Sequence, residues 1–139
     1  MIPKPNYSLV VPQDISHLKD LVLPKDWSFL HSWFNSIPAI LTLSPEAYEV
    51  HYKDKPLLLI GAVQLSRLSP ERELWMLGTK HLSFLHLPAM REMFNGWRAE
   101  RDFPLYARGN TREKCRYLEF FGFTPLAVED GITLYEAPK

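Results

Sequence analysis

The sequence has one cysteine and only six glycines, against twelve prolines. A lone Cys115 excludes an intrachain disulfide and a cysteine-based metal site, so a hydrophobic core must hold the fold together. The prolines stand mostly where helices and strands are expected to begin or end. Lysine plus arginine equals aspartate plus glutamate, 16 of each, so a broad basic surface for specific nucleic-acid binding is not expected.

Long hydrophobic runs are also missing. No segment approaches the ~20 apolar residues that span a bilayer, and the amino terminus lacks the apolar stretch of a signal peptide. Hydrophobic residues make up 46% of the chain and charged residues 23%, which is typical of an ordinary globular protein. A length of 139 residues favours a single domain over residues 1–139.

The amino-terminal half predicts short elements separated by prolines. Two of them are helices, because apolar residues recur at helical spacing after Asp14 and Asp26, which are good N-cap residues. Residues 39–42 are apolar and fit either a strand or a loop. The elements expected here are a strand over 7–11, helices over 14–22 and 26–34, a proline-initiated helical turn over 44–47, and strands over 48–52 and 57–65 around a turn at 53–55.

The carboxy-terminal half predicts a crossover helix between two strands. Leu87, Met90, Phe94 and Trp97 recur at helical spacing, and a proline in the first turn is tolerated. The expected elements are a strand over 74–77, helices over 86–101 and 111–121, a strand over 105–107, and a hairpin of strands 123–128 and 132–135. The fold class is therefore α/β with a mixed sheet, in which an antiparallel meander leads into a parallel pair joined by a crossover helix.

Two motifs in this order of elements resemble the GNAT acetyltransferase superfamily: residues 74–79 (LWMLGT) and residues 117–123 (YLEFFGF). The first is similar to a phage-type group that includes the small internal virion proteins of short-tailed phages. The resemblance covers most of the chain from Tyr48 onward. It implies a GNAT-like fold, with acetyl-CoA as the cofactor of active members. The positions that would contact this cofactor are Leu77, Gly78, Thr79 and Asn110.

The segment after the first motif departs from the family pattern. GNAT enzymes hold the pyrophosphate of acetyl-CoA on backbone N–H groups of a glycine-rich loop at a helix N-terminus. Here residues 79–88 contain no glycine, Phe84 and Leu85 are bulky, and Pro88 lacks an N–H donor. A phosphate cradle is therefore not expected at this position.

The second motif departs as well. Many GNAT enzymes place a tyrosine general acid four residues before its glycine, and here that position is Leu118. Tyr117 is turned by about 100° around the helix and should point elsewhere. Asn110 lies one position further from Gly122 than the family's asparagine usually does.

Several polar residues allow both a functional and a structural interpretation. Glu73 begins the central strand, where a general base could lie, but it is also a plain strand-end carboxylate. His81 and His86 could bind a phosphate or a metal as a pair, but no third metal ligand is near in sequence, so no metal site is expected. The cations Lys80, Arg112, Lys114 and Arg116 alternate with glutamates and favour a salt-bridged surface. Cys115 fits a core position, whereas Trp27 and Trp33, if exposed, would mark a protein interface.

Kept scaffold motifs beside missing catalytic parts favour a GNAT-fold protein with a degraded acetyl-CoA site. It would be a non-catalytic virion-associated or assembly accessory protein that binds other phage virion or assembly proteins, found in the host cytoplasm during assembly and inside the virion. No cofactor is expected. The alternative is an active acetyl-CoA-dependent N-acetyltransferase with Glu73 as base, and a third option is a host-directed inhibitor.

One geometric feature separates the first two hypotheses. An enzyme needs an open gap between strands 74–77 and 105–107, with free N–H groups over residues 78–82. A plug of Phe84 or Leu85 in that gap would exclude it.

Overall fold

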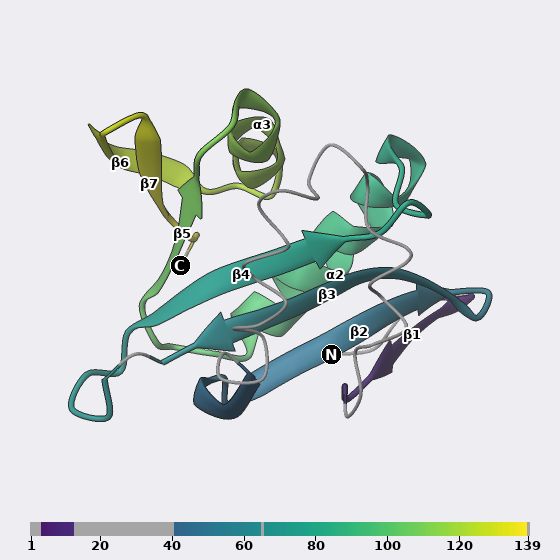
Figure 1. Cartoon of the computed structure of the whole chain (residues 1–139). Coiled ribbons are helices and arrows are strands. Elements are labelled where there is room, and N and C mark those ends of the chain that lie inside the picture. Colours follow the sequence, from purple (N-terminus) through teal and green to yellow (C-terminus); the bar gives the residue numbers. More distant parts are fainter. Residues whose placement is uncertain (1–3, 13–40, 65, 139) are drawn as a thin grey trace.

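The computed structural model describes residues 4–12, 41–64 and 66–138 (Figure 1). The helices expected over 14–22 and 26–34, with Trp27 and Trp33, lie outside the described residues. Within them, seven strands form one sheet in the order β1-β2-β3-β4-β5-β7-β6. The elements are β1 (Tyr7–Val10), β2 (Glu46–Tyr52), β3 (Lys55–Val63), β4 (Arg72–Gly78), η3 (Phe84–His86), α2 (Leu87–Ala99), β5 (Leu105–Gly109), α3 (Arg112–Phe120), β6 (Thr124–Glu129) and β7 (Ile132–Glu136).

The expected fold class is confirmed. Strands β1 to β4 form an antiparallel meander, β4 and β5 are parallel, and α2 connects them. The predicted turns also lie where the chain takes left-handed backbone angles, with φ of 49° and 66° at Lys53 and Asp54 and of 53° and 78° at Asp130 and Gly131. The sequence did not indicate that β7 would pair with β5 and leave β6 at the sheet edge.

The helical turn expected over residues 44–47 is wrong. Glu46 and Ala47 already belong to β2, where they pair with Ala62 and Gly61 of β3. The proline signal was overridden because strand pairing gives these residues ladder hydrogen bonds that one helical turn cannot supply. Of the ambiguous residues 39–42, residues 41 and 42 are helical.

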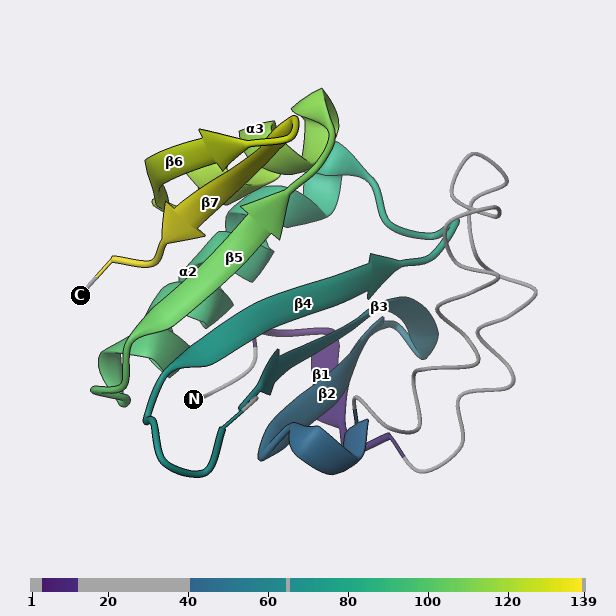
Figure 2. The same ribbon diagram turned by 60° about the vertical axis from the view of Figure 1, so that its left-hand side comes forward.

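The main core lies between the sheet and α2, which runs behind β3 and β4 in Figure 1 and behind β5 in Figure 2. Phe94 of α2 lies in this core, with its ring centroid 5.8 Å from that of Phe121 and 5.5 Å from that of Phe123. The second motif is thus packed directly against the crossover helix. Burying a side chain of this size contributes about 1.5–3 kcal/mol. The buried members of this core include Val50, Leu58, Ala62, Leu74, Met90, Met93, Trp97, Leu105, Ala107 and Leu118.

The other face of the sheet is organised around Trp75. Its indole ring crosses Gly61 on the neighbouring strand, where a Cβ atom would lie 2.6 Å from the ring. Its Nε1–H group donates to Ser44 Oγ at 3.1 Å. A glycine usually weakens a central strand, and it often marks a site where another group approaches the backbone closely. At Gly61 that group is the indole ring of Trp75 from the first motif.

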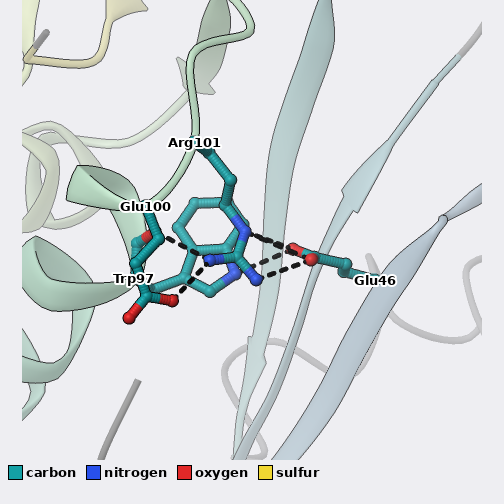
Figure 3. A network of polar contacts seen from close by, with 4 residues as sticks. All are labelled: Glu46, Trp97, Glu100 and Arg101. Carbon is teal, nitrogen blue, oxygen red and sulfur yellow. Dashed lines mark hydrogen bonds and ion pairs between the residues drawn. The ribbon is translucent and has the colours of Figure 1, made fainter.

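A polar clamp fastens the carboxy-terminal end of α2 to the start of β2 (Figure 3). The carboxylate of Glu46 accepts hydrogen bonds from Trp97 Nε1 at 2.8 Å and from Arg101 Nη2 at 2.7 Å. The same guanidinium donates to the carbonyl oxygen of Trp97 and to the carboxylate of Glu100. The clamp fixes the position of the crossover helix against the sheet.

Candidate functional site

The parallel strands β4 and β5 are paired only where they begin. The register joins Arg72 to Leu105 and Glu73 to Tyr106, and beyond these residues the two strands separate (Figure 2). We call this region the β4–β5 divergence; it lies between residues 74–78 and residues 107–109. The two backbones thus separate at the level where the enzyme hypothesis needs a gap.

Alternate residues of β4 direct their backbone groups to alternate sides. Thr79 N donates to Leu57 O of the β3 side, and Arg72 N donates to Pro104 O at the start of β5. Odd-numbered residues of β4 therefore hydrogen-bond toward β3 and even-numbered residues toward β5. It follows that the N–H and C=O groups of Met76 and Gly78 face the divergence.

The four residues proposed for cofactor contact come to the same edge of the sheet. If the parallel pairing of Arg72 with Leu105 continued along both strands, Asn110 would lie opposite Leu77. Leu77 is buried and its backbone faces β3, whereas Gly78 has its backbone toward the divergence. Thr79 is buried, and its hydroxyl donates to Pro56 O at 2.6 Å and accepts from His81 N at 3.2 Å. Thr79 is therefore a structural residue that ties the end of β4 to β3.

The segment from Thr79 to α2 uses many of its own backbone donors. Besides Thr79 and His81, the N–H groups of Leu82 and His86 donate within the segment, to the carbonyl oxygens of residues 79 and 83. The side chain of His86 makes no cap hydrogen bond to α2, and a proline occupies the first turn. These pairings take the N–H groups of His81, Leu82 and His86 away from a phosphate.

Phe84 and Leu85 do not plug the divergence. Their side chains are 73% and 75% exposed to solvent. The condition that would have excluded an enzyme is therefore not met. These two large apolar side chains are exposed to water just before α2 and do not fill the space between the strands.

Glu73 lies at the closed end of the divergence, on the second residue pair of β4 and β5. Its carboxylate is in an ion pair with Arg108 Nε at 3.0 Å. The Glu73 side chain is 25% exposed and that of Arg108 is 63% exposed. The ion pair engages one of the two carboxylate oxygens, Oε1, and the exposure of Arg108 keeps it weak.

Leu118 stands where the family has its tyrosine, and its side chain carries no proton donor. This residue is 7% exposed and belongs to the core. Tyr117 points away from it, and its hydroxyl donates to Glu113 Oε1 at 3.1 Å within the same helix. The orientation expected from the helical period is what the structure shows.

Tyr135 is a buried phenol that the sequence did not single out. It lies on β7 opposite Ala107 of β5, and its hydroxyl donates to Glu119 Oε2 at 3.0 Å. Burial, with the nearby Cys115 and Glu119, raises the pKa of Tyr135 well above its usual value. The alternating pattern of residues 132–135 placed it in a strand, but only the unexpected strand order brings it beside β5. The half-buried Cys115 lies against Gly109, with its thiol 3.6 Å from that carbonyl oxygen, as expected for a core position.

The ring of His86 belongs to an aromatic cluster with Tyr7 and Tyr52. The ring of His86 is held by the Tyr7 hydroxyl, 2.8 Å from Nδ1, and lies 4.8 Å from the Tyr52 ring. Burial and the neighbouring Tyr52 raise the pKa of Tyr7. Within residues 4–12, 41–64 and 66–138, no three metal-binding side chains come together. This aromatic cluster joins β1 and β2 to the start of α2, which is a structural role.

Comparisons with known proteins bear on the fold. No family model and no curated protein matches the sequence. Solved structures do match: an acetyltransferase from Agrobacterium tumefaciens has a TM-score of 0.71 and 15% identity, over 99% of this chain and 94% of that one. The Campylobacter jejuni N-acetyltransferase PseH in complex with acetyl coenzyme A has a TM-score of 0.62 and 12% identity, covering 94% and 96%. A GNAT-family acetyltransferase of Desulfovibrio desulfuricans scores 0.62 at 14% identity, covering 94% and 96%.

The similarity to these solved structures extends over nearly the whole chain, so it includes the sheet and the helices described above. Among the described residues, no helix is long and apolar enough to cross a membrane. The chain therefore has the mixed α/β fold of the GNAT acetyltransferases.

Proposed function

We propose that this chain is a non-catalytic GNAT-fold protein that acts as a virion-associated or assembly accessory factor of a bacteriophage. One observation carries the proposal: the groups that acetyl transfer would need are apolar or already paired. Leu118 occupies the position of the acid within the core, and Glu73 is engaged by Arg108. On this proposal the scaffold is kept while its chemistry is lost.

The cofactor site supports the same interpretation. Binding of a pyrophosphate at a helix N-terminus needs several free N–H groups that point at the ligand. Here the donors of His81, Leu82 and His86 are used within the segment, and Pro88 has none. We therefore expect weak binding of acetyl-CoA at best, with partner proteins as the natural ligands.

The phage assignment rests on the resemblance of residues 74–79 to small internal virion proteins. Its test is to purify particles of the encoding phage and identify their proteins by mass spectrometry. The proposal expects this chain at a fixed copy number per particle. Its complete absence from particles, with normal amounts in infected cells, would favour the host-directed alternative.

A second function, acetyl-CoA-dependent N-acetyl transfer, is favoured by the β4–β5 divergence. The backbone groups of Met76 and Gly78 face a region that Phe84 and Leu85 leave open. A structural neighbour was solved with acetyl coenzyme A bound. In such an enzyme the amine would attack the thioester directly, so positioning and electrostatic stabilisation would carry much of the rate.

This second function has a sharp test in Glu73. If it is the base, Glu73→Gln lowers kcat at least about 100-fold, whereas Glu71→Gln, a change of the neighbouring exposed glutamate, leaves kcat unchanged. The assay is release of coenzyme A thiol from acetyl-CoA in the presence of mixed amines. No thiol release by the unmodified chain supports the non-catalytic proposal.

A further inference from the structure

An apolar cavity of about 80 Å³, partly open to solvent, lies between α2 and the face of β1 to β4 that α2 covers. A water molecule needs roughly 10–15 Å³ of such space, and an engineered apolar cavity of about 150 Å³ accommodates benzene. The volume is therefore too large for an ordinary packing defect and suits a chain of about four carbons. Its walls include Val50, Ala62, Leu74, Met76 and Met93.

The cavity offers almost nothing to water. Its lining is nearly all apolar. The carboxylate of Glu46 is at its margin but is already satisfied by Trp97 and Arg101. A cavity without free polar partners stays dry and gains by taking up an apolar group.

The cavity lies directly beside the β4–β5 divergence. Leu74 and Met76 form its β4 wall, and the backbone groups of the same two residues face the divergence. Phe121, from the end of α3, also lines it. An elongated ligand that enters along β4 would therefore reach the cavity without crossing another strand.

Three of the four methionines in the chain line this one space: Met76, Met90 and Met93. Methionine side chains are unbranched and adapt their shape to what they contact. Their concentration here, on both the strand and the helix side, makes the walls deformable. A flexible aliphatic chain can be accommodated with little strain, which a wall of branched residues would not allow.

We propose that this cavity is a binding site for an unbranched aliphatic chain of about four carbons. The chain could be the acyl group of a thioester that lies along β4, or the tail of a free amphiphile; its methylene groups are what the site recognises. The inference does not rest on the proposed function, because the cavity belongs to the core between sheet and helix. It adds a ligand class to a fold whose catalytic groups are blocked.

The test uses the methionines as reporters. The full chain is labelled with ¹³C in the methionine methyl groups and titrated with ethanol, with 1-butanol and with butyryl-CoA. We expect 1-butanol to shift the Met76, Met90 and Met93 signals in a saturable way. Its half-saturation should be about tenfold below that of ethanol, the gain from two buried methylene groups.

Two variants that narrow the cavity provide the control. Ala62→Val and Val50→Ile add carbon from different strands and should each weaken 1-butanol binding about tenfold. Ala127→Val, the matched change at an exposed strand position, should leave it unchanged. If butyryl-CoA produces the same shifts, the chain arrives as an acyl thioester; if only the alcohol does, it comes as a free amphiphile. Shifts that do not saturate, or that persist unchanged in both narrowing variants, overturn the proposal.

Discussion

Removing the carboxylate of Glu46 should destabilise the chain far more than its position at the first residue of β2 suggests. In Glu46→Ala the indole N–H of Trp97, a buried residue, loses its acceptor. An unpaired buried donor costs about 1–3 kcal/mol, and a hydrogen bond to a charged group contributes about 1.5–3 kcal/mol. Side-chain exposures of 23% for Glu46 and 21% for Arg101 let water recover part of this loss.

We therefore expect the free energy of unfolding to fall by about 2–3 kcal/mol in Glu46→Ala. The assay is urea denaturation at neutral pH, where a loss of this size lowers the midpoint by roughly 1 M or more with an unchanged slope. Glu100→Ala removes the exposed partner of the same guanidinium and should cost far less than Glu46→Ala.

A double-mutant cycle tests the reasoning itself. Combining Glu46→Ala with Arg101→Ala isolates the interaction between the two side chains, because each single change breaks it once. The geometry of three short contacts predicts a coupling energy above about 1 kcal/mol. A coupling energy near zero, or equal losses in Glu46→Ala and Glu100→Ala, would refute the view that this clamp fixes the crossover helix.

Three further outcomes follow from single contacts. Gly61→Ala should lower the free energy of unfolding by about 1–3 kcal/mol, because its Cβ would lie 2.6 Å from the Trp75 ring. Gly96→Ala is the control: nothing lies within 4 Å of its Cβ, so the free energy of unfolding should rise by about 0.5–1 kcal/mol. Thermal or urea unfolding measures both changes. Thr111→Ala removes the side-chain cap that accepts from Lys114 N and should cost about 1 kcal/mol, with hydrogen exchange faster in the first turn of α3. Burial alone raises the pKa of Glu46, but the hydrogen bonds from Arg101 and Trp97 outweigh it and lower the pKa below the unfolded value. The resulting stability is present above about pH 4.5 and is lost as the pH falls through the folded pKa of Glu46. The difference in free energy of unfolding between the unmodified chain and Glu46→Gln should therefore shrink in acid. A constant difference from about pH 3 to 7 would contradict this.

The elements that the sequence predicted well are those whose pattern and neighbours agree. The helix of Leu87, Met90, Phe94 and Trp97 forms α2 because its apolar stripe has a sheet face to cover. The failed helical turn over residues 44–47 shows the opposite case. A local proline signal there competes with a strand ladder and with the clamp on Glu46, neither of which is visible in the sequence.

The order of elements predicted from the sequence places residues 77–79 and Asn110 at the carboxyl ends of two neighbouring parallel strands. It does not predict the contacts around them. Sequence periodicity does not encode the ion pair of Glu73 with Arg108, or the position of Tyr135 beside β5, because both depend on the order in which distant strands pair. The exposure of Phe84 was likewise hidden, since bulk alone does not say which way a side chain points.

The central claim is that the fold is kept while the acetyl-CoA site is not, and a calorimetric titration of the full chain with acetyl-CoA tests it most directly. The account predicts no saturable heat at micromolar concentrations, because the N–H groups of His81, Leu82 and His86 are paired within the segment and Pro88 has none. A dissociation constant in the micromolar range, with one site per chain, would contradict it.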